Sequence, residues 1–126
     1  MNVPDELKYA ESHEWVRVEG DVATVGISDY AQQEMTELVY VELPDVGREC
    51  NAGEDVAVVE SVKSASDIYA PVGGEIIEVN EGLADDPSQV NSSPFEQGWL
   101  FKIRMADSAQ LDNLLDAAAY KQKIGS

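Results

Sequence analysis

The chain has 126 residues, 44% of them hydrophobic, which predicts one domain with a buried core. Its 8 lysine and arginine residues stand against 25 aspartate and glutamate residues, so the net charge at pH 7 is −17. This charge argues against nucleic acids and anionic membranes as partners, because both are bound by basic surfaces. It favours a monomer that docks on basic surfaces of other proteins.

Runs of alternating apolar and polar residues, separated by glycine, proline and aspartate, predict seven or eight short β-strands. These runs cover residues 13–19, 22–27, 38–43, 48–52, 55–60, 65–70, 75–79 and 99–105. Between the second and third runs, Ser28 or Asp29 is expected to cap a short helix over 30–35. Residues 80–93 are polar and turn-rich, which predicts a surface loop with room for one helical turn.

The C-terminal segment predicts a last helix over about 108–120, capped by Asp107 and Ser108. Its apolar stripe has helical spacing and is expected to pack against the core; it consists of Leu111, Leu114, Leu115 and Ala118. The pattern shows no alternation of strands and helices, so a parallel sheet is not expected. We therefore expect a mainly β domain over 1–126, a sandwich or small barrel with its core at about 7–105.

The most informative stretch is the hairpin formed by residues 55–60 and 65–70, which places Lys63 at its tip. Most exposed lysines only solvate a surface, and this one could simply neutralise the acids around it. Lysine is scarce in this chain, however, and Lys63 is the only cation of the hairpin. We interpret it as the attachment point of a covalent cofactor.

The sequence offers little catalytic machinery of its own. The only histidine is His13, and no Gly-x-Ser-x-Gly elbow is present to supply a nucleophile. His13 and the single cysteine, Cys50, do not have the spacing of metal ligands, and one cysteine cannot form an intramolecular disulfide. We therefore predict no catalytic and no metal-binding residues, and we expect an attached group to supply any chemistry.

Several ordered blocks resemble the H proteins of the glycine cleavage system over roughly residues 7–120. The blocks include Ser12-His-Glu-Trp15, Gly26-Ile-Ser-Asp29, Val41-Glu-Leu-Pro44, Glu60-Ser-Val-Lys-Ser-Ala-Ser-Asp67, Glu78-Val-Asn80 and Asn91-Ser-Ser-Pro94. The resemblance implies a barrel-sandwich hybrid of two antiparallel sheets, with short helices and a C-terminal helix. It also implies that Lys63 carries lipoic acid in amide linkage.

The resemblance assigns roles to further residues. Glu60, three residues before Lys63, and Gly74, eleven residues after it, match the positions that lipoate-attaching enzymes favour in this family. The loaded arm is expected to rest in a cleft, for which the candidate residues here are Ser12, His13, Glu14, Glu34 and Asp67. Many relatives have histidine at the position of Glu34 and glycine at that of Thr36. Glu34 could pair with the amine of the arm or could be one more solvated acid.

The implied function is that of a carrier subunit rather than an enzyme. The lipoyl arm takes the aminomethyl group of glycine from the P protein, a pyridoxal-phosphate decarboxylase, and delivers it to the T protein, an aminomethyltransferase. The L protein, a dihydrolipoyl dehydrogenase, then reoxidises the arm. Some relatives also relay lipoate to other complexes, and this role stays open here.

Other interpretations make different predictions. Lipoyl domains of 2-oxoacid dehydrogenases usually show Asp-Lys-Ala and biotin carriers Met-Lys-Met, whereas this chain has Val62-Lys63-Ser64. An unmodified acidic interaction module would never carry lipoate, and a hydrolase built on His13 would act without a cofactor. The N-terminus lacks the features of a signal or transit peptide, which favours a bacterial cytoplasm; a mitochondrial matrix protein whose transit peptide has been removed would look the same.

Overall fold

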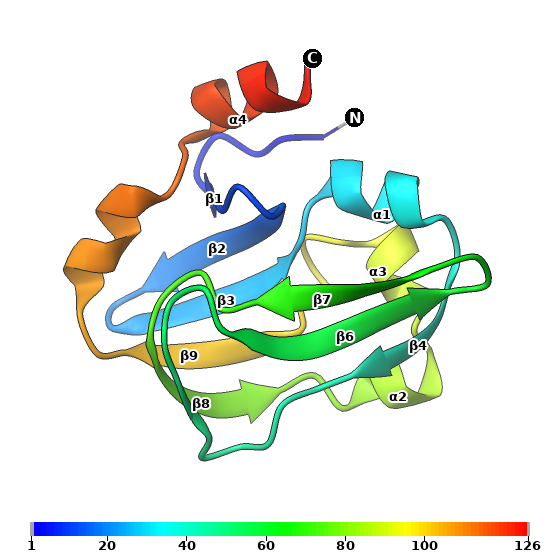
Figure 1. Ribbon diagram of the computed structural model, residues 1–126, viewed down its shortest axis with the longest axis horizontal. Helices are drawn as coiled ribbons and strands as arrows, with labels where there is room; N and C mark the ends of the chain where they lie inside the picture. The colour runs from blue at the N-terminus through cyan, green and yellow to red at the C-terminus, as the bar shows by residue number, and fades with distance from the viewer. Residues whose placement is uncertain (1, 126) are drawn as a thin grey trace.

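The computed structural model describes residues 2–125 and shows two antiparallel sheets with short helices at their edges (Figure 1). The larger sheet has the order β1-β2-β3-β9-β8-β5, and the smaller has the order β4-β6-β7. The larger sheet consists of β1 (Lys8–Tyr9), β2 (Glu14–Glu19), β3 (Val22–Ile27), β9 (Phe101–Met105), β8 (Gly74–Val79) and β5 (Glu49–Cys50). The smaller sheet consists of β4 (Leu38–Glu42), β6 (Asp55–Ser61) and β7 (Ala65–Tyr69). The expectation of a mainly β fold with two antiparallel sheets is confirmed.

The main core lies between the two sheets. Alternation along each strand points one set of side chains inward, so that Val25 and Ile103 of the larger sheet and Val59 of the smaller one are all almost fully buried. The β2–β3 hairpin turns at Gly20, whose φ of 64° suits glycine. Burial of one face of each strand sets the register, since a slip by one residue would expose that face.

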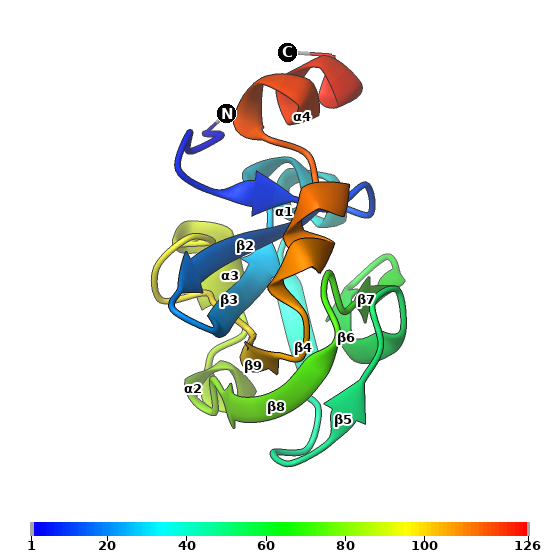
Figure 2. The same cartoon turned by 90° about the vertical axis from the view of Figure 1, so that its left-hand side faces the viewer.

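A second, aromatic cluster closes one end of the molecule and holds the two chain ends together. Tyr9 on β1 and Tyr120 on α4 (Ala117–Ile124) stack with ring centroids 4.5 Å apart, and both rings are fully buried. Figure 2 shows α4 beside the N-terminal segment, at the opposite end from β5. This packing brings α4 close to α1 (Asp29–Met35), which matters for the site described below.

The segment expected to form one helix over 108–120 is divided in the structure. Residues Ser108–Asn113 form a 3-10 helix, the chain is then extended, and α4 begins only at Ala117. Leu115 exchanges two backbone hydrogen bonds with Tyr9, of 2.8 and 2.7 Å, and Asp116 caps α4 by accepting a hydrogen bond from the Ala119 N–H. Pairing with β1 therefore prevents the helix that the apolar spacing predicted.

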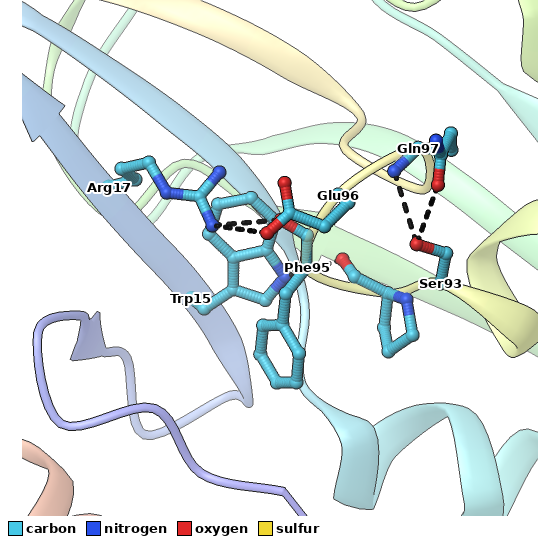
Figure 3. Close-up of polar contacts among 7 residues, drawn as sticks. Trp15, Arg17, Ser93, Phe95, Glu96 and Gln97 are labelled. Carbon is cyan, nitrogen blue, oxygen red and sulfur yellow. Dashed lines mark hydrogen bonds and ion pairs between the residues drawn. The ribbon is translucent and has the colours of Figure 1, made fainter.

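The loop at 80–93 is more ordered than predicted, because it contains two short helices, α2 (Gly82–Asp85) and α3 (Gln89–Ser92). Side chains of β2 bind the segment that follows α3 through hydrogen bonds (Figure 3). The Trp15 indole N–H donates to the Pro94 carbonyl at 2.9 Å, and the Arg17 guanidinium donates to the Phe95 carbonyl at 2.8 Å while lying 5.0 Å from the Trp15 ring centroid. These contacts fix α3 relative to the larger sheet.

Candidate functional site

Lys63 lies at the tip of the β6–β7 hairpin, as the sequence predicted. The turn is closed by the Ser61 N–H, which donates to the Ser64 carbonyl at 2.8 Å, and by the Ser61 hydroxyl, which accepts from the Ser64 N–H at 3.2 Å. Lys63 is exposed and takes part in none of the ion pairs found within residues 2–125. A hydrogen-bonded turn at the end of the β6–β7 hairpin (Figure 1) thus carries an exposed lysine that has no ion-pair partner among the described residues.

The two predicted recognition residues lie in different places. Glu60 is half-buried on β6, next to the turn, and is paired across the sheet with Tyr40 and Ala65. Gly74 begins β8 in the other sheet, away from the hairpin tip (Figure 1). A Cβ atom at Gly74 would lie 2.0 Å from the Arg104 carbonyl oxygen, so the close approach of β9 explains this glycine without reference to Lys63.

An apolar groove of about 260 Å³ runs between α1 and the smaller sheet. Its apolar lining comes from Ile27, Ala31, Met35, Val59 and Ile68. The Ser64 hydroxyl lies 3.9 Å from the Met35 sulfur, so the end of α1 touches the lysine-bearing turn. The groove therefore opens next to Lys63.

Of the five residues predicted to line a cleft, three border this groove. Ser12, His13 and Glu34 are among its lining residues. Glu14 is not, because its side chain is fully buried behind Ser12. Asp67 is also absent from the lining, because alternation along β7 directs Ser66 and Ile68 to the groove and Asp67 to the opposite face. The structure thus brings the first three together and leaves the last two outside the groove wall.

His13 is held by a chain of hydrogen bonds that begins on α4. Its Nδ1 lies 2.8 Å from the Tyr120 hydroxyl, which lies 2.6 Å from the Ser28 hydroxyl, and Ser28 caps α1 by accepting from the Ala31 N–H. Burial lowers the pKa of His13, and nearby Lys123 lowers it further, although Glu34 opposes both effects. A neutral imidazole is therefore expected on the groove wall at pH 7.

Glu14 is a buried carboxylate directly behind the groove. It accepts a hydrogen bond from the Ser12 hydroxyl and a second one, of 3.0 Å, from the Tyr69 N–H. Burial raises the pKa of Glu14 above its usual value, and these hydrogen bonds oppose the shift. The carboxylate thus ties the start of β2 to the end of β7, on the two sides of the groove.

Sequence reasoning missed the residues that shape the groove from a distance. The Asn91 side chain accepts from the Leu38 N–H at 2.9 Å and donates to the Thr36 carbonyl at 2.7 Å and to the Gln32 side chain at 3.1 Å. It therefore fixes the turn between α1 and β4, which follows Met35 of the groove wall. The only sequence signal was the Asn91-Ser-Ser-Pro94 block, whose contacts come from sequence positions more than fifty residues away.

The arrangement around His13 does not resemble a hydrolytic triad, since its ring nitrogen bonds to a tyrosine hydroxyl and not to a carboxylate. Within residues 2–125, no group of three or more histidine, cysteine, aspartate or glutamate side chains is arranged to hold a metal ion. Over the same range, none of the helices has the length and apolar character needed to cross a membrane.

Comparison with known proteins identifies the family. The glycine cleavage H-protein family model matches residues 7–126. The chain belongs to the glycine cleavage H-protein family. It is 59% identical over 124 residues to the glycine cleavage system H protein of Alcanivorax borkumensis, covering 98% of this chain and 97% of that protein. It is 58% identical over 121 residues to that of Cronobacter sakazakii, covering 95% and 94%.

The fold agrees with a solved member of the family. The crystal structure of a glycine cleavage system H protein from Mycobacterium marinum matches with a TM-score of 0.89 at 35% identity, covering 98% of this chain and all of that one. Membership of this family supports the role of a lipoyl carrier in the glycine cleavage system and implies partners within that system. The family consists of carrier subunits and not of catalysts.

Proposed function

We propose that Lys63 carries lipoate in amide linkage and that the chain shuttles the aminomethyl group of glycine from the P protein to the T protein. The lipoyl group would supply the disulfide that accepts this cargo and that the L protein regenerates. The observation that carries the proposal is Lys63 itself, an exposed amine on a closed turn beside an apolar groove, with no ion-pair partner within residues 2–125. Tethering to a rigid turn raises the effective concentration of the arm at each partner's site.

The groove is suited to an uncharged, mostly apolar arm. Amide formation removes the lysine charge, so the arm can lie against side chains such as Ile27, Val59 and Ile68 without a large desolvation penalty. The polar lining residues of the groove include Ser12 and His13, which offer hydrogen-bonding groups to the arm.

We propose Ser12, His13 and Glu34 as the residues that meet the arm. Glu34 is exposed and could attract an amine, as could the carboxylate of Glu14 behind the wall if the arm displaced the Ser12 hydroxyl. Asp67 would need the arm to cross the rim of β7, since it faces away from the groove. Glu60 is proposed to aid recognition by lipoate-attaching enzymes because it adjoins the turn.

The setting proposed for this carrier is the cytoplasm of a bacterium, where it would act as a monomer. The relatives described above are bacterial, and the net charge of −17 opposes self-association. A further role in relaying lipoate to other complexes is compatible with the same arm, since any acyl-transfer enzyme that reaches Lys63 could use it.

The test is the intact mass of the protein after incubation with a lipoate ligase, ATP and lipoate. A single lipoyl increment is expected in the wild type and in Lys123→Arg, a matched variant of another exposed lysine, and none in Lys63→Arg. The lipoylated protein should then support exchange of the glycine carboxyl carbon with a P protein. A wild type that takes no lipoyl group, or a Lys63→Arg variant that does, would contradict the proposal.

A further inference from the structure

Large apolar side chains are exposed around the lysine-bearing turn. Within residues 2–125, six large hydrophobic side chains are substantially exposed, and three of them belong to this end of the smaller sheet. Val62 is 81% exposed, and Val39 and Tyr40 are each 50% exposed. Val62 precedes Lys63, and Leu38 and Tyr40 are paired with Ser61 and Glu60 at the base of the turn. With the usual strand spacing, Val39 and Tyr40 lie within about 10 Å of the Lys63 backbone.

A β-bulge produces this exposure. The register between β4 and β6 shifts between Leu38 and Tyr40, which leaves Val39 as the extra residue. Leu38 and Val41 remain in the core, while the adjacent Val39 and Tyr40 both face solvent. Bulges recur beside functional sites, where they redirect a side chain. A bulge on an edge strand can also merely prevent aggregation, but charged residues serve that purpose, and here a valine and a tyrosine are displayed instead.

Carboxylates frame this apolar surface. Glu37 and Glu42 are exposed on either side of Val39 and Tyr40, and Glu60 lies across the strand pair from Tyr40. Lys63 is the only cation of the hairpin at 55–70. The surface thus combines an apolar centre with an acidic rim, and it suits a partner whose own contact surface is apolar at the centre and lined by arginine or lysine.

We propose that Val39, Tyr40 and Val62 form the docking surface for the enzyme that attaches lipoate to Lys63. The inference rests on the proposed function. An attaching enzyme acts on the lysine nitrogen itself, so it must cover the surface within one side-chain length of the turn. Enzymes that use the finished carrier act at the far end of the arm and can contact the protein elsewhere.

The reaction itself requires this close approach. The Lys63 nitrogen forms an amide bond with the carbonyl carbon of lipoyl adenylate, the bond from that carbon to the phosphate oxygen breaks, and AMP leaves. The ammonium group gives up two protons in becoming the amide N–H. Lys63 must therefore enter a closed active site, and neighbouring apolar side chains that lose water on docking can anchor it.

The test compares kcat/KM for lipoate attachment by a purified lipoate ligase, followed by intact mass, for unmodified Val39→Ser and Tyr40→Ser variants. Each is expected to fall about tenfold, equivalent to ~1.4 kcal/mol of lost transition-state binding. Val46→Ser is the matched control, because Val46 is 62% exposed in the turn after β4 and lies outside the proposed surface. It should remain within about twofold of the wild type.

A second readout separates the possible occupants of this surface. Variants lipoylated to completion with excess ligase should exchange the glycine carboxyl carbon with a P protein at the wild-type KM. Normal attachment with impaired exchange would assign the surface to the P protein and overturn the inference, as would equal loss in Val46→Ser. Wild-type protein that takes no lipoyl group would instead refute the proposed function.

Discussion

Replacing Thr36 by glycine should stabilise the protein. Thr36 follows the last residue of α1 and has φ 65° and ψ −158°, a combination that is essentially restricted to glycine. Its Cβ is crowded there, and the conformation persists because neighbouring groups impose it. One of these is Asn91, whose side chain donates to the Thr36 carbonyl at 2.7 Å.

The expected gain can be estimated from opposing terms. Holding a non-glycine residue in this backbone region lowers the free energy of unfolding by roughly 1–3 kcal/mol, and glycine would remove this strain. Glycine loses about 0.5–1 kcal/mol through the greater freedom of the unfolded chain, and the exposed hydrogen bond from the Thr36 hydroxyl to the Met35 carbonyl contributes little. The net stabilisation should be about 1 kcal/mol, which corresponds to a rise of about 4 °C in Tm for a chain of this length.

Urea unfolding and calorimetry of the wild type, Thr36→Gly and Thr36→Ala would measure this difference. Thr36→Ala removes the same hydroxyl and methyl groups but keeps a Cβ, so it should be no more stable than the wild type. Equal stabilisation by glycine and alanine would attribute the effect to the side chain and refute the argument from backbone strain. A less stable Thr36→Gly would refute it as well.

Gly74→Ala should lower the free energy of unfolding by roughly 3 kcal/mol, because the added Cβ would lie 2.0 Å from a β9 carbonyl oxygen. An unchanged urea midpoint together with slower lipoate attachment would instead identify Gly74 as a recognition residue only. Burial raises the pKa of Glu14 in the folded state above its ordinary value of 4.5. Between these two pKa values the folded state binds more protons than the unfolded state. The free energy of unfolding, compared with that of Glu14→Gln, should therefore fall as pH rises through the raised pKa. Urea titrations between pH 4 and 8 test this, and a relative stability that rises with pH over that window would contradict it. Asn91→Ala should lower the free energy of unfolding by about 2 kcal/mol. It should also speed hydrogen exchange of the Leu38 amide at the start of β4, because this amide donates to the Asn91 side chain. Asn80→Ala is the control, because it removes hydrogen bonds to the Gln97 and Trp99 carbonyls and should leave the Leu38 amide protected. Equal exchange of this amide in both variants would contradict the positioning role of Asn91.

Local pattern was enough to predict most strands and the position of Lys63. The strand predicted over residues 22–27 matches β3 to the residue, because it returns from the Gly20-Asp21 turn and pairs with β2 as a hairpin. The turn at Lys63 was predictable because two β-branched runs flank a few small polar residues, and residues so close in sequence leave only a hairpin as the connection.

The groove depended on tertiary structure. Glu14 was predicted to line the cleft, but the fold places its carboxylate behind Ser12, where the Tyr69 N–H of the other sheet donates to it. His13 gained its partner from Tyr120, 107 residues away, on a helix whose start was itself determined by pairing of Leu115 with β1.

The sequence by itself therefore determined most of the strands but not β1, and it determined that a lysine lies at a hairpin tip and that the protein is strongly acidic. These are properties of neighbours along the chain, where side-chain alternation and turn chemistry act. Only the tertiary structure decided that α1 packs over the smaller sheet to form a groove beside Lys63 and that a bulge exposes Val39 and Tyr40 next to it. Such features depend on contacts between segments far apart in sequence, and no local periodicity records them.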